Sequence, residues 1–313
     1  MLTGSAGSAV HPQATSHDAG PPGQVAPRRS SWRRWALLSA ALFAIYAVYY
    51  CTYGAEMHYH RARAAWGAYQ YETAAKEARA ALAFRPRMGK AHHLLGLALL
   101  SLGQPAAAVA PLERAVALRP NVAEWHTDLG IGYEAVGRTS DAVAQHKLSL
   151  KLDPTRADAH SNLAMCYWRE GEVAEAEQQY RLAMACDPGD GQVRMTYGVL
   201  LEETGRTEEA RRLYEEVIGL TDSSRHYIGG PTNPGIGAAL RLGRLCLKQN
   251  HPYEALWCFE QASRLFDGKS GKVRQAIEEG MTAALKALKA AAPPGQFLAP
   301  FPVPAPAATV PVS

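Results

Sequence analysis

The sequence predicts an all-α protein, in which a solenoid of helical hairpins follows a single membrane-spanning helix near the N-terminus. Two observations predict this fold. Residues of the same type recur every 34 positions through most of the chain, and residues 35–55 carry no charge. The composition agrees with it, because 47% of the 313 residues are apolar and 20% are charged, so that the chain can bury a core.

The N-terminal segment, residues 1–34, is expected to be a disordered basic tail. It is rich in Gly, Ser, Ala and Pro and has no apolar periodicity. Four arginines stand at its end: Arg28, Arg29, Arg33 and Arg34. The rest of the chain is nearly neutral, which argues against a nucleic-acid partner, because such a partner requires a basic face.

Residues 35–54 are predicted to form a transmembrane signal-anchor helix, since about 20 helical residues span a bilayer core of roughly 30 Å. Aromatic side chains suited to the headgroup layer stand at both ends: Trp32, Trp35, Tyr49, Tyr50 and Tyr53. A cleaved signal peptide and a buried helix of a soluble protein remain alternatives. The long basic segment before the apolar run and the tyrosines after it favour the permanent anchor.

The arginine cluster also predicts the orientation of this helix. Arginines before a span hold the N-terminus in the cytoplasm, so the body of the protein is expected on the non-cytoplasmic, periplasmic side. The Arg- and Ala-rich composition is typical of a GC-rich bacterial genome. We therefore expect a single-pass protein of a bacterial inner membrane.

The internal repeat is visible in four columns of residues. The members of each column lie 34 residues apart, at Pro86, Pro120, Pro154 and Pro188; at Gly103, Gly137, Gly171 and Gly205; at Ala108, Ala142, Ala176 and Ala210; and at His58, His92, His126 and His160. Four columns with one period indicate stacked supersecondary units rather than a single compact core.

Residues 157–190 show the pattern most fully, with His160, Leu163-Ala164, Tyr167, Gly171, Ala176, Tyr180, Ala183 and Pro188. This pattern resembles the tetratricopeptide repeat family, and residues 157–164 look most like the repeats of the O-GlcNAc transferase superhelix. The resemblance implies a right-handed superhelix of helical hairpins. Glycine at position 15 of each repeat permits the left-handed turn between the two helices, and proline at position 32 ends the second helix.

The repeat boundaries divide the rest of the chain. We expect a degenerate repeat at 55–88, repeats at 89–122, 123–156, 157–190, 191–224 and 236–269, a loop insertion at 225–235, a capping helix at 270–291 and a Pro-rich disordered tail at 292–313. Pro111 falls inside a predicted second helix, where it should cause a kink unless the solvent side absorbs the lost bond. The insertion lacks the GK[ST] ending of a phosphate-binding loop.

No catalytic constellation is recognised, so an enzyme is not expected. Equivalent histidines in neighbouring repeats lie about 10 Å apart, too far for one metal ion, which favours a packing role. Two cysteine pairs stand on facing helices, Cys166 with Cys186 and Cys246 with Cys258. Buried free thiols are expected, and a disulfide is the alternative if the body is exported. We expect no metal, cofactor or small-molecule substrate.

The resemblance also implies where a partner binds. In this family, positions 2, 5, 6, 9, 12 and 13 of each first helix face an inner groove. The candidate groove residues are apolar (Leu97, Leu100, Ile131, Met165, Trp168, Val199), polar or acidic (Asp128, Glu134, Asn162, Glu202) and basic (Arg241, Arg244, Lys248). These positions predict an acidic middle and a basic C-terminal end. The apolar residues could instead pack between neighbouring first helices. The chaperone-binding carboxylate clamp of some relatives is absent, since Thr127 and Ile131 stand where Lys and Asn are required.

The sequence therefore predicts a non-enzymatic, membrane-anchored scaffold. It would bind a peptide or helix of a partner protein in its groove, in the assembly or biogenesis of an envelope complex. The alternative is an accessory subunit of an envelope glycosyltransferase or polysaccharide-export system, suggested by the resemblance of residues 157–164 to glycosyltransferase-linked repeats.

Overall fold

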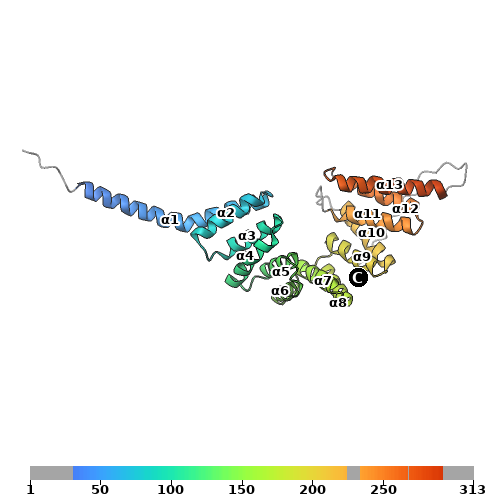
Figure 1. Cartoon of the computed structure of the whole chain (residues 1–313), viewed down its shortest axis with the longest axis horizontal. Coiled ribbons are helices and arrows are strands. Elements are labelled where there is room, and N and C mark those ends of the chain that lie inside the picture. Colours follow the sequence, from blue (N-terminus) through green and yellow to red (C-terminus); the bar gives the residue numbers. More distant parts are fainter. Residues whose placement is uncertain (1–30, 224–232, 267, 292–313) are drawn as a thin grey trace, which may run out of the picture. The chain divides into compact units, whose positions relative to one another are not determined.

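The computed structural model describes residues 31–223, 233–266 and 268–291, and every regular element among them is a helix (Figure 1). The helices are α1 (Ser31–Gly67), α2 (Tyr71–Phe84), α3 (Gly89–Ser101), α4 (Pro105–Leu118), α5 (Ala123–Ala135), α6 (Thr139–Leu152), α7 (Ala157–Glu170), α8 (Val173–Cys186), α9 (Gly191–Glu203), α10 (Thr207–Ser223), α11 (Pro234–Lys248), α12 (Pro252–Leu265) and α13 (Gly271–Ala291).

The chain divides into two units, residues 1–52 and residues 53–313. The described part of the first unit belongs to α1, whose apolar side chains are exposed; Trp35 and Phe43 are each 72% exposed. Among the described residues, the stretch Trp35–Gly67 is the one helix long and apolar enough to cross a membrane, judged by length and composition alone.

The predicted tail ends four residues too late, because α1 begins at Ser31 rather than after residue 34. The loss of charge at residue 35 marks the start of the apolar run, but nothing in the preceding Trp-Arg-Arg sequence stops a helix. Both predicted disordered tails otherwise lie outside the described residues.

The second unit is built from helical hairpins in chain order, each packed on the next. The two helices of each repeat pair as α3–α4, α5–α6, α7–α8, α9–α10 and α11–α12, and α13 packs on α11 and α12. First helices also contact one another, as α3 with α5, α5 with α7 and α9 with α11. We call the surface formed by the first helices, α3, α5, α7, α9 and α11, the first-helix face.

The turn inside each hairpin uses one left-handed residue. Gly171 ends α7 with φ of 82°. The degenerate first repeat makes the same turn with Tyr69 at φ 60°, and the last repeat makes it with Asn250 at φ 62°. A side chain in this conformation costs roughly 1–2 kcal/mol, so packing must hold the turn where glycine is missing. The degenerate repeat therefore keeps its hairpin despite its weak sequence pattern.

The seam of each hairpin depends on a small residue at position 8, over which a large residue from the second helix lies. A Cβ on Gly130 would stand 2.4 Å from Cε1 of His146, and one on Gly198 would stand 2.7 Å from Cε1 of Tyr214. Neither position has room for a side chain unless its neighbour moves. The large residues are completely buried, as Tyr214 and His146 show.

The repeated histidines join a hairpin to the turn before it. Nε2 of His126 lies 2.8 Å from the carbonyl oxygen of Pro120, and Nδ1 lies 2.7 Å from Oε1 of Gln145. His160 repeats both contacts, with Pro154 at 3.1 Å and Gln179 at 2.8 Å. This column therefore has the packing role that its spacing predicts.

Two segments depart from the regular repeat, the insertion before α11 and the proline inside α4. Most of the predicted insertion lies outside the described residues, but α11 begins at Pro234, where the side chain of Asn233 caps the backbone N–H of Gly235 at 2.9 Å. The helix thus starts before the predicted repeat boundary at residue 236. Pro111 does not end α4, which continues to Leu118.

Candidate partner-binding face

The predicted groove residues all lie on first helices. They are distributed over α3 (Leu97, Leu100), α5 (Asp128, Ile131, Glu134), α7 (Asn162, Met165, Trp168), α9 (Val199, Glu202) and α11 (Arg241, Arg244, Lys248). The contacts between neighbouring first helices bring most of these segments side by side. Exposure and pairing then separate residues that are open to a partner from residues that are already engaged.

The apolar candidates differ in exposure. Ile131 is 38% exposed and Val199 only 9%. Burial of Val199 favours the packing alternative for this residue. Met165 and Trp168 are half-buried on α7, and with Arg169 they line an open hollow of about 290 Å³.

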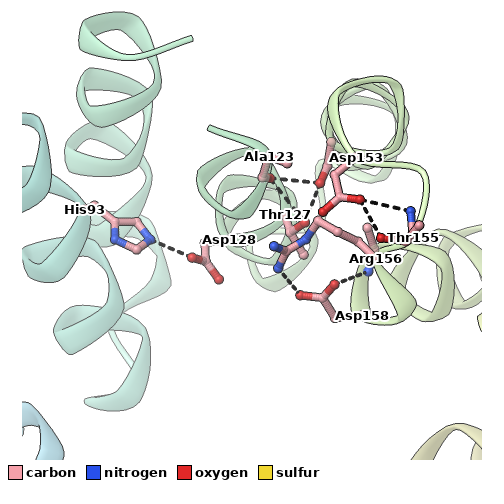
Figure 2. A network of polar contacts seen from close by, with 10 residues as sticks. His93, Ala123, Thr127, Asp128, Asp153, Thr155, Arg156 and Asp158 are labelled. Carbon is pink, nitrogen blue, oxygen red and sulfur yellow. Dashed lines mark hydrogen bonds and ion pairs between the residues drawn. The ribbon is translucent and has the colours of Figure 1, made fainter. Parts of the chain in front are cut away.

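Asp128 is held by a histidine of the preceding repeat (Figure 2). Nε2 of His93 lies 2.6 Å from Oδ2 of Asp128, and the imidazole stacks on Trp125 with the ring centroids 5.1 Å apart. Asp128 is therefore engaged in joining α3 to α5, which weakens the expectation that it binds a peptide backbone.

A second polar network fixes the loop between α6 and α7 (Figure 2). Asp153 accepts hydrogen bonds from the backbone N–H and hydroxyl of Thr155, at 3.0 and 2.7 Å, and these bonds lower the pKa of its carboxyl. Arg156 pairs with Asp158 on α7. These contacts engage a further acidic group near the expected acidic middle of the face.

Position 5 of the same repeat as Asp128 points into the protein. Thr127 is 1% exposed, and its hydroxyl lies 2.8 Å from that of Ser149, which donates to the carbonyl of Ala123 at 2.8 Å. A residue at this place does not reach the surface. The burial of Thr127 is therefore a second reason, besides the residue type, why this repeat lacks the carboxylate clamp.

Glu134 is the centre of a cluster at the junction between α5, α6 and α7. It accepts from Nε2 of His146 and from Nη1 of Arg169, each at 3.0 Å. Cys166 lies beside it, and burial, reinforced by the Glu134 charge, raises the pKa of this thiol to about 12. The carboxylate side chain is only 10% exposed.

Glu202 occupies the equivalent place two repeats further on. It accepts from the hydroxyl of Tyr214 at 2.9 Å and from Nη1 of Arg241 at 3.2 Å. Burial, with the hydrogen bond to Glu202 as the next cause, raises the pKa of Tyr214. Both predicted groove glutamates are thus neutralised by a partner from the next repeat, so the middle of the face is less acidic than its sequence suggests.

The polar candidates that stay available are few. Asn162 is half-buried, and Arg244 and Lys248 are exposed; within the described ranges none of the three side chains has a hydrogen-bond or ion-pair partner. Sequence reasoning did not single out His93, Trp125 or Arg169. Arg169 occupies position 13 and His93 position 5, so a stricter count of the groove positions would have included both.

The comparisons with known proteins agree with this architecture. A tetratricopeptide repeat family model matches residues 59–123 and 127–191. This part of the chain consists of tetratricopeptide repeats, and the predicted all-α solenoid of hairpins is confirmed. A search of curated protein sequences finds no significant match.

Two solved structures share the fold over most of the chain. PilF of Pseudomonas aeruginosa is 19% identical and has a TM-score of 0.55, with 73% of this chain and 99% of PilF covered. PilW, described as a widely conserved type IV pilus biogenesis factor, is 15% identical with a TM-score of 0.59, covering 71% of this chain and 98% of PilW. At such identities the similarity shows the fold alone.

Proposed function

We propose that this chain is a non-enzymatic, membrane-anchored scaffold that binds a peptide or helix of a partner protein on its first-helix face. The observation that carries the proposal is the hollow lined by Met165, Trp168 and Arg169. A hollow with an aromatic wall, a flexible thioether and one cation at its edge suits a single apolar anchor side chain, such as Leu or Phe. Its shallow, open form does not suit a buried small molecule.

The surroundings of the hollow support a peptide as the occupant. Asn162 stands one helical turn before it, with a half-buried amide that can both donate to and accept from a peptide backbone. Ile131 extends the apolar surface onto α5, which contacts α7. Arg244 and Lys248 offer unpaired positive charge further along the face. We therefore expect an extended or helical segment with an apolar anchor and an acidic group that lies toward the C-terminal end of the face.

The membrane anchor and the envelope role are part of the same proposal. The exposed apolar surface of α1 and the arginines before the apolar run support insertion with the N-terminus in the cytoplasm. Solved structures of this fold include PilW, described as a type IV pilus biogenesis factor, which is consistent with a role in assembling an envelope complex. The pathway itself does not follow from the fold.

Site-specific photocrosslinking in intact membranes tests the binding face. A photoreactive residue at Trp168 should give a discrete crosslinked product, and one at Leu182 on α8, which is 40% exposed on a second helix, should not. Trp168→Ala should also release the partner recovered with the full-length chain, whereas Leu182→Ala should retain it. Equal crosslinking from both positions would contradict the proposed face.

A reporter fused after Ser313 tests the topology. It should give the non-cytoplasmic signal, and changing Arg28, Arg29, Arg33 and Arg34 to Glu should weaken or invert that signal. Cytoplasmic reporter activity from the unaltered fusion would reverse the orientation and place the partner on the other side of the membrane.

A further inference from the structure

Three side chains with metal-ligand chemistry meet at the first of the two glutamate junctions. Glu134 comes from α5, His146 from α6 and Cys166 from α7, and their ligand atoms all lie within 4.8 Å of one another. None belongs to the repeated histidine column, whose members are too far apart to share an ion. The junction therefore brings together a nitrogen, an oxygen and a sulfur donor that the periodicity of the sequence does not connect.

Two buried polar atoms at this junction have no hydrogen-bond partner within the described chain, Nδ1 of His146 and the hydroxyl of Tyr180. Both side chains are completely buried. Burial, with the charge of Glu134 as the next cause, raises the pKa of the Tyr180 hydroxyl. Within the described chain, the one hydrogen bond of the His146 ring is that from Nε2 to Glu134.

The imidazole is also unusual for its place in the repeat. The corresponding buried positions hold Leu112, Tyr180, Tyr214 and Phe259 in the other full repeats and Ala78 in the degenerate repeat. Packing over the position-8 residue needs only a large apolar or aromatic side chain, which leaves no ring nitrogen without a partner. What His146 adds is an Nε2 atom directed at Glu134 and close to the Cys166 sulfur.

We propose that Glu134, His146 and Cys166 form a binding site for Zn²⁺ or a similar first-row divalent cation. Thiolate, imidazole and carboxylate are the three ligand types that zinc takes in proteins, at about 2.0–2.3 Å. Two ligands in tetrahedral geometry then lie roughly 3.3–3.8 Å apart, within the span of this cluster. The thiol of Cys166 releases its proton to solvent as the sulfur–metal bond forms, and the ring proton of His146 moves from Nε2 to Nδ1 so that Nε2 can bind the ion.

A fourth ligand can approach from the side on which Arg169 lies, because that residue is at the solvent-exposed edge of the junction. Arg169 now covers Glu134 from that side and is 52% exposed, so it can turn to solvent when a cation replaces it. A water or a partner's side chain completes the coordination.

Occupancy would have two consequences. It would tie two successive repeats together, because α5 and α6 belong to one and α7 to the next. It would also free the guanidinium of Arg169 at the edge of the hollow, which makes that hollow more attractive to an acidic partner. Metal binding would then strengthen the binding of an acidic partner, although each could also bind alone.

The second glutamate junction is a natural control. Glu202 and Tyr214 stand where Glu134 and His146 stand, and Leu245 takes the place of Cys166. This set has one metal-ligating group instead of three. It keeps the carboxylate and the buried hydrogen bond, and so shows what the junction looks like when only packing is required.

The test uses the full-length chain, purified in detergent without a histidine tag and titrated with Co²⁺. A thiolate–cobalt charge-transfer band should appear with one Co²⁺ per chain and disappear when one equivalent of Zn²⁺ is added. The band should be lost in Cys166→Ala and in His146→Tyr. It should persist in Cys186→Ala and Cys258→Ala, which remove other thiols, and in Glu202→Gln.

His146→Tyr also keeps the test independent of folding. Tyr214 shows that a tyrosine fits over a position-8 glycine and reaches the glutamate, so this variant should retain the helical circular dichroism and urea midpoint of the parent. The proposal is overturned if the parent gives no band, or if the band survives in both site variants. It is equally overturned if Cys258→Ala abolishes the band, since the ion would then bind at another thiol.

Discussion

The two glutamate junctions surround equivalent carboxylates with different side chains. Glu134 is bound by His146 and Arg169 beside a cysteine, whereas Glu202 is bound by Tyr214 and Arg241 beside a leucine. The tyrosine junction satisfies its buried polar atoms, while the histidine junction leaves Nδ1 of His146 without a partner in the described chain. The comparison shows that one repeat geometry accommodates both a junction whose buried polar atoms are all paired and a junction that contains an unpaired polar atom and a thiol.

Removing the large residue of each junction should have the largest effect. Tyr214→Ala should lower the free energy of unfolding by about 3–5 kcal/mol, because it empties a fully buried aromatic site. His146→Ala should cost less, roughly 1–3 kcal/mol, since the ring is smaller and one unpartnered nitrogen disappears with it. Urea unfolding followed by circular dichroism measures both, and an equal loss would contradict the asymmetry.

Filling the seam glycines should have the next largest effect. Gly130→Ala and Gly198→Ala should each cost about 1–3 kcal/mol, because the new methyl would stand 2.4 Å from His146 and 2.7 Å from Tyr214. Gly219→Ala is the matched control. It lies in helix α10, where an added methyl would meet nothing within 4 Å, so it should stabilise by up to about 1 kcal/mol. Thermal unfolding of the three variants distinguishes close approach from helix propensity.

Alkaline pH should weaken the histidine junction first. In the metal-free chain the folded-state pKa of Cys166 is raised from an ordinary value of 9.0 to about 12, so its contribution to stability is complete below pH 9 and is lost as the pH rises toward 12. The raised pKa of Tyr214 has the same sign, but its loss begins only near its ordinary value of 10.0.

Cys166→Ala should therefore flatten the fall in stability between pH 9 and pH 10 by up to about 1 kcal/mol. Urea unfolding at pH 8, 9 and 10 measures this, with Cys186→Ala as the exposed-thiol control. Parallel pH profiles for the parent and Cys166→Ala would show that the thiol does not titrate with unfolding.

The arginines should have the smallest effect on stability. Arg169 is 52% exposed and Arg241 is 40% exposed, and ion pairs with such exposed partners contribute about 0–1 kcal/mol. Arg169→Ala and Arg241→Ala should thus change the urea midpoint little and about equally. Only Arg169→Ala should alter partner binding, because Arg169 borders the hollow. Loss of binding in both variants would indicate a general electrostatic role.

Much of the fold could be predicted because the same geometric constraints select the same residue types in each repeat. Position 15 recurs as glycine where the backbone turns left-handed, and position 8 is small where a large side chain must lie over it. These constraints are local to one hairpin, so a single sequence displays them several times. Where the pattern fails, as at Tyr69, the hairpin is held by its neighbours, which a local pattern cannot show.

The sequence by itself determined the class of protein, the order of its hairpins, the apolar segment of α1 and the face on which a partner is expected. Only the tertiary structure decided which groups on that face are free. Glu134, Cys166 and Arg169 meet across two repeats, and the burial of Val199 favours packing over the groove, two alternatives that its position left open. The physical reason is that periodicity specifies where a backbone position lies, whereas the pairing of a carboxylate depends on side chains that come from three helices and obey no repeat.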